Sequence, residues 1–170
     1  FGLLDKGTKK YDANELAAER DRIAMGGGFQ AGAERSAFGY RILTRNLEPS
    51  LGLAAEMLRN PVFPQDELDK VKAQISAYLA TLQQAPSSAA SGLFDRAIYG
   101  ADNPMGAVWT PELVQQVDRA SLRKWHEAEV TPDNMTVYMI GDIDINVAKA
   151  ALEKTFGRWN ARNRSSLRPV

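Results

Sequence analysis

Cysteine is absent from this sequence of 170 residues, and histidine occurs only once, as His126. Without cysteine the chain has no disulfides, no thiolate nucleophile and no Cys-type zinc site, although this absence suits the cytosol and the periplasm equally. A single histidine cannot complete a zinc site with histidine ligands, which needs three or four ligands in all. No G-x-S-x-G elbow accompanies the serines, so a serine-based catalytic triad is not supported either.

An excess of charge of either sign is also missing, since 21 Lys and Arg residues balance 21 Asp and Glu residues. No segment concentrates basic side chains enough to follow a row of phosphates, so we expect no nucleic-acid partner. The apolar runs are too short for a membrane span, and we expect none. With 44% hydrophobic and 25% charged residues, the composition is that of one globular domain.

Helix and strand signals occur in groups along the chain. Asp12 and Glu15 form a capping-box pattern that predicts a helix to about Ala24, which the glycines at 26–28 end. Alternating residues predict a hairpin or two antiparallel strands from FQAGAE and AFGYRIL, and MTVYMI predicts a buried strand. Spacing and caps predict further helices from Leu47 to Leu58, Leu68 to Leu82, Ser87 or Ser88 to Tyr99, from Thr110, from Asp118 through Trp125, and from Val147 to Phe156.

This grouping predicts an α+β fold with a mainly antiparallel sheet and helices packed on one face. Too few strands are visible to close the sheet, so we expect a missing strand before Phe1. We expect one half-domain over residues 1–160, truncated at its N-terminus. The polar and basic segment 161–170 is predicted to be a linker or tail.

Two local patterns invite a functional interpretation, and packing explains each better. The glycines at 26–28 follow a helix and precede a strand, which is the reverse of the order in a phosphate loop, so a helix end is favoured. His126 and Glu129 lie three residues apart and could offer two metal ligands on one helix face. Because nothing completes the set, we predict a packed, partly buried histidine beside Trp125.

A third pattern resembles a calcium loop. Four side chains occupy positions one, three, five and twelve of such a loop, namely Asp142, Asp144, Asn146 and Glu153. Val147 stands at position six, where the sharp turn of the loop needs glycine. We therefore favour Asp144 as the N-cap of a helix, with a calcium-tuned binding module as an alternative.

Four longer segments follow one another in a characteristic order from about Leu3 to Trp159. They are LLDKGTKKYDANELAAERDRI, RILTRNLEPSLGLAAEMLRNPVFPQDELDKVKAQI, FDRAIYGADNPMG and WHEAEVTPDNMTVYMIGDID. Together they resemble the insulinase/pitrilysin family of zinc metallopeptidases, which includes the mitochondrial processing peptidases. A member of this family contains two similar α+β halves, and the resemblance implies that this chain is most of a first half.

The resemblance also implies where a catalytic member holds zinc. Such members carry His-x-x-Glu-His on the helix before the Gly-Thr step, and a glutamate on a later helix completes the site. With Gly7-Thr8 aligned, the glutamate and the second histidine fall on Phe1 and Gly2, and the later glutamate falls near Gln74. These side chains bind zinc poorly or not at all. The resemblance thus implies a non-catalytic repeat or subunit without its own cofactor, and zinc in a catalytic partner domain or subunit.

The resemblance further implies a role in proteolysis, because family members close two domains around an extended peptide. The inactive partner supplies chamber wall and substrate contacts, and a strand of the catalytic repeat pairs with the substrate backbone. The resemblance places the counterpart of that strand in this chain at residues 28–34. The implied substrate-binding positions are Gly28, Phe29, Gln30, Ala31, Gly32, Ala33 and Glu34. The alternative is a small-residue strand that packs on another domain.

Our leading hypothesis is therefore a non-catalytic domain of a zinc metalloendopeptidase, joined to its catalytic domain in one chain or in a heterodimer. One alternative from another class is an assembly subunit without a peptidase role, which the resemblance also allows. Composition does not settle the compartment, and the periplasm is favoured for a bacterial protein of this kind.

Overall fold

The computed structural model describes residues 2–32 and 35–159, so the predicted tail at 161–170 lies outside the described residues. The expected α+β class is confirmed. The first elements are α1 (Ala13–Arg22), β1 (Gly26–Gln30), β2 (Ala37–Arg41), η1 (Thr44–Asn46) and α2 (Leu47–Arg59). They are followed by α3 (Gln65–Gln83), α4 (Pro86–Tyr99), η2 (Pro104–Gly106), α5 (Pro111–Gln115), α6 (Arg119–Glu129), η3 (Pro132–Asn134) and α7 (Ile145–Phe156).

Several helix ends follow the predicted capping chemistry. The Asp12 side chain accepts hydrogen bonds from the backbone amides of Asn14 and Glu15, and the Glu15 carboxylate accepts from the Asp12 amide. Asp118 and Ser121 form the same reciprocal arrangement at the start of α6. Gly100 ends α4 with a φ of 84°, in the left-handed region that glycine adopts readily.

The two strands form an antiparallel hairpin whose first strand begins earlier than the sequence pattern predicted. β1 starts at the glycines and pairs with β2 from Gly26 opposite Arg41 to Gln30 opposite Ala37. Gly27 has a φ of 137°, and a Cβ built there would lie 2.2 Å from the Gly39 carbonyl oxygen. Glycine at this position therefore lets the two backbones approach, in addition to ending the preceding helix.

The core lies beneath this hairpin, between it and the helices of one face. One cluster joins the N-terminal turn to α2, the start of α3 and the end of α6. Its buried members are Leu3, Leu4, Leu58, Phe63, Leu68 and Val130. A second cluster joins α1 to α2 under the hairpin. Its buried members are Leu16, Ile23, Met25, Leu53, Ala54 and Met57.

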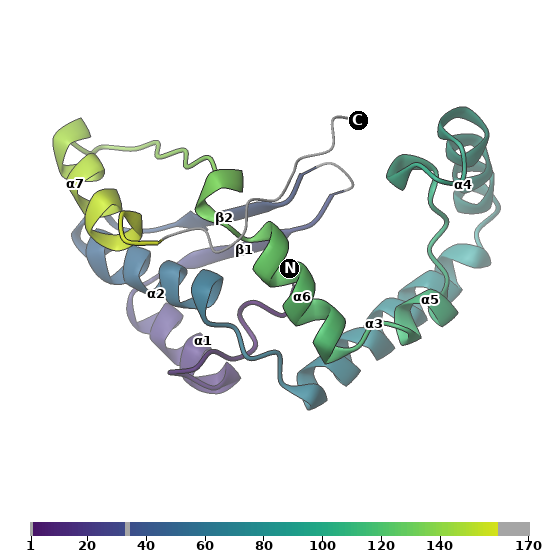
Figure 1. The fold of residues 1–170 in the computed structure, drawn as a ribbon, viewed down its shortest axis with the longest axis horizontal. Helices are drawn as coiled ribbons and strands as arrows, with labels where there is room; N and C mark the ends of the chain where they lie inside the picture. Colours follow the sequence, from purple (N-terminus) through teal and green to yellow (C-terminus); the bar gives the residue numbers. More distant parts are fainter. Residues whose placement is uncertain (1, 33–34, 160–170) are drawn as a thin grey trace.

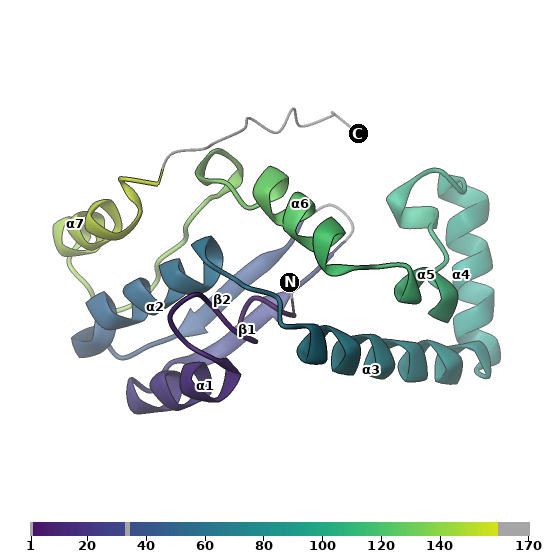
Figure 2. The same cartoon turned by 60° about the horizontal axis from the view of Figure 1, so that its bottom comes forward.

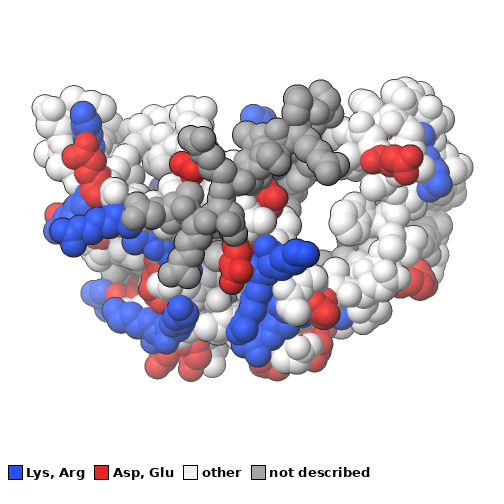
Figure 3. Space-filling view, viewed as in Figure 1, with Lys and Arg blue, Asp and Glu red and all other residues white. Residues whose placement is uncertain are grey.

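Helices α3, α4 and α5 form a helical arm (residues 65–117) that projects from this body (Figures 1 and 2). At the base of the arm, Leu68 is buried in the core of the body. Farther out, apolar side chains are exposed, and Tyr78 and Phe94 are 62% and 64% exposed. Residues 73–94 contain no charged side chain, and Figure 3 shows few charges on the outer arm compared with the body. Lys72 links α3 to α5 by donating 2.8 Å hydrogen bonds to the carbonyl oxygens of Gln115 and Val117.

One predicted strand is wrong as stated. MTVYMI at 135–140 was expected to be a buried strand, but the segment belongs to no sheet of the described residues, and Tyr138 and Ile140 are 84% and 97% exposed. The apolar and β-branched composition favours an extended backbone, but a strand also needs a neighbour for its amides and carbonyls. No helix in the described part of the chain combines the length and apolarity that a membrane span requires.

Candidate functional site

The two faces of the β1–β2 hairpin differ sharply in character. Phe29, Phe38 and Tyr40 lie on the inner face, where the Phe38 ring centroid is 4.6 Å from that of Phe29 and 4.7 Å from that of Tyr40. All three are partly buried against the core. Because side chains alternate along a strand, the neighbouring residues lie on the opposite, outer face.

The middle of the hairpin's outer face is bare of side chains, whereas Gln30 and Arg41 carry long side chains toward its two ends. Gly28 and Gly39 lie directly opposite one another, and a Cβ built on either would meet no atom within 4 Å. A trough of about 370 Å³ runs over them. The trough is lined by Gly27, Gly28, Phe29, Gln30, Ala37 and Gly39. A surface of this kind presents backbone rather than side chains to whatever lies on it.

The hairpin also has open edges. In the described part of the chain β1 pairs only with β2, so its second edge carries no neighbouring strand. Amides and carbonyls without another partner along such an edge can take up an extended peptide, with an affinity that depends little on the peptide sequence. The Gly27 carbonyl oxygen of β1 already accepts a hydrogen bond from Arg20. The arrangement suits strand addition.

Arg20 fixes the position of the hairpin on α1. Its guanidinium donates to the Asp5 carboxylate at 3.0 Å and to the Gly27 carbonyl oxygen at 2.9 Å. It also lies 5.2 Å from the ring centroid of Tyr40. Burial raises the pKa of Tyr40 to about 12, so its hydroxyl stays neutral at ordinary pH. One arginine thus connects the N-terminal turn, α1 and both strands.

The structure brings part of the predicted substrate-binding set together. Gly28, Phe29 and Gln30 lie in β1, and the exposed Ala31 and Gly32 follow it directly. Phe29 faces inward, and the predicted positions Ala33 and Glu34 lie outside the described residues.

Sequence reasoning missed two residues of the same surface, Gly39 and Ala37 on β2. The signal was present in AFGYRIL, because apolar residues at 38, 40 and 42 on one face place residues 37 and 39 on the other. Gly39 and Ala37 lie opposite Gly28 and Gln30 of β1, and their small side chains indicate a surface with few side-chain atoms that both strands build.

The positions aligned with a zinc site are separate from the hairpin. Gly2 lies exposed in the N-terminal turn, Gln74 lies exposed on α3, and Phe1 is outside the described residues. Within the ranges that the structure describes, no group of three or more Asp, Glu or His side chains is placed to hold a metal ion.

His126 is packed, as the sequence predicted. Its Nε2 lies 2.7 Å from the Leu58 carbonyl oxygen, and its ring meets Phe63 edge-on with centroids 5.8 Å apart. A carbonyl oxygen only accepts hydrogen bonds, so Nε2 carries the proton in the neutral ring. Burial lowers the pKa of His126, and this hydrogen bond opposes the shift in part. The histidine therefore joins α6 to α2.

The residues of the calcium-like pattern also have structural roles. The Asp144 carboxylate accepts hydrogen bonds from the amides of Asn146 and Val147 and caps α7, as predicted. Helix α7 already begins at Ile145, so the backbone does not form the twelve-residue loop of a calcium site.

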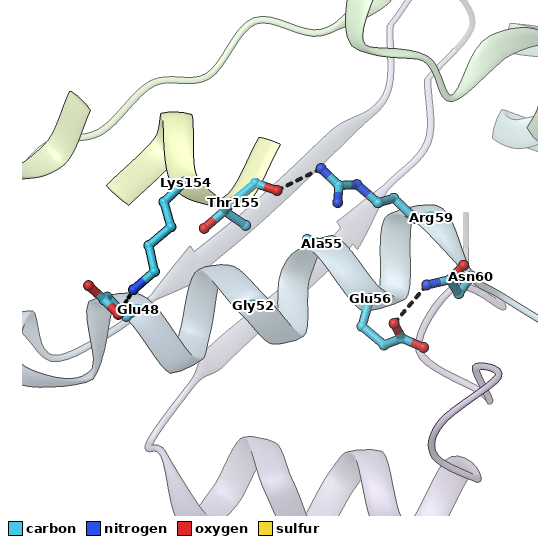
Figure 4. A pocket seen from close by; sticks show the side chains of 8 residues that line it. All are labelled: Glu48, Gly52, Ala55, Glu56, Arg59, Asn60, Lys154 and Thr155. Atoms are coloured by element: carbon cyan, nitrogen blue, oxygen red, sulfur yellow. Dashed lines mark hydrogen bonds and ion pairs between the residues drawn. The ribbon is translucent and has the colours of Figure 1, made fainter. Parts of the chain in front are cut away.

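A second hollow, of about 330 Å³, lies between α2 and α7 (Figure 4). Two contacts join the helices across it: Lys154 contacts Glu48 at 2.6 Å, and Arg59 donates to the Thr155 carbonyl oxygen at 2.6 Å. Glu56 Oε1 and Arg59 Nε are buried without a hydrogen-bond partner among the described residues. The Arg59 guanidinium also lies over the rings of Phe156 and Trp159. This hollow is a contact between two helices and offers no group poised for chemistry.

Comparison with known proteins assigns this fold to a family. Residues 3–107 match the family model described as insulinase (peptidase family M16), and residues 116–170 match the model described as the peptidase M16 inactive domain. The chain belongs to the insulinase family. The second match, to the inactive-domain model, covers only the C-terminal third of the chain.

Relatives and solved structures agree with this assignment. An uncharacterized zinc protease of Mycobacterium leprae is 28% identical over 171 residues, which cover 98% of this chain and 38% of the relative. The crystal structure of a peptidase M16 inactive domain from Pseudomonas fluorescens has a TM-score of 0.89 and 22% identity, over 99% of this chain and 41% of that chain. The first half of the periplasmic protease PqqL from Escherichia coli has a TM-score of 0.78 and 20% identity, over 98% of this chain and 37% of that one. The chain thus spans about two fifths of the length of the proteins it matches.

Proposed function

We propose that this chain is the non-catalytic part of a zinc endopeptidase and forms a wall of the chamber in which a catalytic partner domain cleaves peptides. The observation that carries this proposal is the hairpin, whose outer face is backbone at Gly28 and Gly39 and whose β1 strand pairs only with β2 among the described residues. An extended substrate lies along that surface and is held by main-chain hydrogen bonds, while the chain contributes no catalytic group.

The proposal assigns the metal to the partner. Relatives of this chain are named zinc proteases, and the zinc-aligned positions described here, Gly2 and Gln74, cannot replace histidine and glutamate as ligands. The catalytic domain is either a further part of the same polypeptide or a separate subunit. The periplasmic neighbour from Escherichia coli supports a periplasmic location for a bacterial protein, which fractionation of the host cell would test.

The substrate contact is tested by filling the trough. Gly28→Val adds a β-branched side chain that a strand accommodates, at a position where the Cβ meets nothing in the free chain. In the full-length zinc-loaded protein we expect kcat/KM for a quenched fluorescent peptide mixture to fall at least about tenfold, the effect of 1.4 kcal/mol of lost binding.

Gly52→Val is the matched control. Gly52 lies on α2, away from the hairpin, and its Cβ also meets nothing within 4 Å. An unchanged kcat/KM for Gly28→Val, with the fold intact, would contradict the substrate contact. An assembly subunit without a peptidase role predicts that same unchanged rate.

The placement of zinc has its own measurement. The isolated chain is expected to hold no zinc after dialysis and to cleave no peptide, whereas the complex with its catalytic partner does both. Stoichiometric zinc or metal-dependent cleavage by the isolated chain would show that our interpretation of Gly2 and Gln74 is wrong.

A further inference from the structure

A short corner (residues 60–64) joins the body to the helical arm. It lies between the end of α2 and the start of α3, and it contains Pro61 and Pro64. Figures 1 and 2 both show the chain returning from the arm beside this corner, where α6 begins. The two covalent connections between the arm and the body thus lie next to each other.

Phe63 in this corner has an unusual backbone conformation. Its φ is 48°, in the left-handed region that a large side chain rarely adopts. Phe63 also precedes Pro64, and a proline ring restricts the residue before it to extended conformations. A residue in such a conformation costs free energy, so the surrounding contacts must hold it there. An extended Phe63 would send α3 in a different direction, so the backbone of this residue sets the angle between arm and body.

Val62, the residue before Phe63, is bound through both of its backbone groups. Its amide donates to the Gly7 carbonyl oxygen at 3.1 Å. Its carbonyl oxygen accepts two hydrogen bonds from the Arg119 guanidinium, at 2.8 Å from Nη2 and 3.2 Å from Nε. Arg119 is the first residue of α6 and directly follows the segment that returns from the arm. One side chain therefore joins the outgoing connection to the returning one.

The Phe63 ring is buried at the same place. It is 3% exposed, belongs to the core cluster that contains Leu4 and Leu68, and meets His126 edge-on. This packing holds the base of the arm against the body, but the burial of apolar surface has no preferred direction. The hydrogen bonds from the planar guanidinium of Arg119 are directional. They are therefore suited to fix an angle.

We propose that Arg119 is a positioning residue that holds Phe63 in its left-handed conformation and thereby fixes the angle of the helical arm to the body. The arm and the hairpin both present exposed surface, and their relative position follows from this angle. When the hydrogen bonds to Val62 are lost, Phe63 relaxes to an extended conformation and the arm takes a second orientation. The proposal does not depend on peptide binding at the hairpin, so the two can fail independently.

Distances between two spin labels in the full-length protein test the proposal. This chain has no cysteine, so Lys149→Cys on α7 and Ser91→Cys on α4 place one label on the body and one on the arm, once any cysteine elsewhere in the protein has been replaced. Both positions are exposed. The unaltered corner should give a single narrow distance distribution. In Arg119→Met we expect the ratio of a second distance to the first to rise at least about tenfold, because two charge-assisted hydrogen bonds are lost.

Two further variants separate positioning from the loss of a charge. Arg119→Lys keeps a donor that can reach the Val62 carbonyl oxygen, so the first distance should be largely restored. Arg123→Met removes an exposed positive charge one turn later on α6 and should leave the single distance unchanged. Several distances with the unaltered corner, a single distance in Arg119→Met, or an equal effect of Arg123→Met would each overturn the proposal.

The backbone of Phe63 is observed directly after isotopic labelling of the phenylalanine carbons. The Cα and Cβ chemical shifts of a residue depend on φ and ψ, which differ between left-handed and extended backbone. In Arg119→Met we expect a second Phe63 signal with the shifts of an extended residue, and Arg119→Lys should lose most of that signal. Unchanged Phe63 shifts in a variant that shows the second distance would mean that another residue absorbs the motion, which contradicts the proposal.

Discussion

The body of the molecule and its helical arm contain similar apolar side chains but bury them to very different extents. Met57 on α2 is fully buried, whereas Phe94 on α4 is 64% exposed. The difference runs along one helix in α3, where Leu68 near the start is 2% exposed and Tyr78 is 62% exposed. Helical periodicity in a sequence therefore identifies an apolar face but does not show that the chain itself covers that face.

The largest predicted effect on the free energy of unfolding comes from replacing one large apolar side chain in each region by alanine. Met57→Ala leaves a cavity among Leu16, Ile23 and Leu53 and is expected to reduce the free energy of unfolding by about 2–5 kcal/mol. Phe94→Ala on the exposed arm is expected to change it by less than about 0.5 kcal/mol. Urea unfolding followed by circular dichroism measures both. Equal losses for the two variants would mean that the arm packs on the body in solution.

A second pair of variants tests the backbone of the hairpin. Gly27→Ala forces a side chain into a φ of 137° and against the Gly39 carbonyl, so we expect a loss of roughly 1–3 kcal/mol. Gly28→Ala, one residue later, meets open space and is expected to be near neutral. Thermal unfolding of the two variants gives the comparison. A neutral Gly27→Ala would show that the strands can separate here at little cost.

The stability of the contact between α3 and α5 in the arm is expected to depend on Lys72. Its ammonium donates to the carbonyl oxygens of Gln115, the last residue of α5, and of Val117, where a cation also stabilises the end of a helix. Lys72→Met should destabilise the contact between α3 and α5 by about 1–2 kcal/mol. We expect the amides of residues 112–117 to exchange faster while those of α2 keep their rates.

Lys70→Met is the control on the same helix. The exposed Lys70 pairs with the exposed Asp66 and with the partly buried Glu67, and solvent reaches Lys70 and screens its ion pairs. The amide exchange of residues 112–117 should stay unchanged in this variant. Faster exchange there would show that loss of any positive charge on α3 loosens the arm, whether or not it contacts α5.

Local chemistry explains which features the sequence predicted. Asp12, Asp118 and Asp144 act on amides two or three residues away, so their caps could be inferred from adjacent letters. Predicting the bare outer face of the hairpin required the register of its two strands. Gly39 was missed because it comes to lie opposite Gly28 only when the strands pair. Burial of 135–140 was predicted from composition, but burial depends on neighbours that the described chain does not supply.

The smallest predicted effect concerns pH and the contact between α6 and α2. Burial lowers the pKa of His126 below its ordinary value of 6.5, so the folded state binds this proton less readily than the unfolded state does. The contribution of the neutral ring to stability is complete above pH 6.5 and is lost as the pH falls through the lowered pKa. His126→Gln retains a side-chain donor that can reach the Leu58 carbonyl but removes the titration. Urea unfolding between pH 7.5 and pH 5 should show a shallower decline for the variant, and identical slopes would mean that His126 is protonated as easily in the folded chain as in the unfolded one.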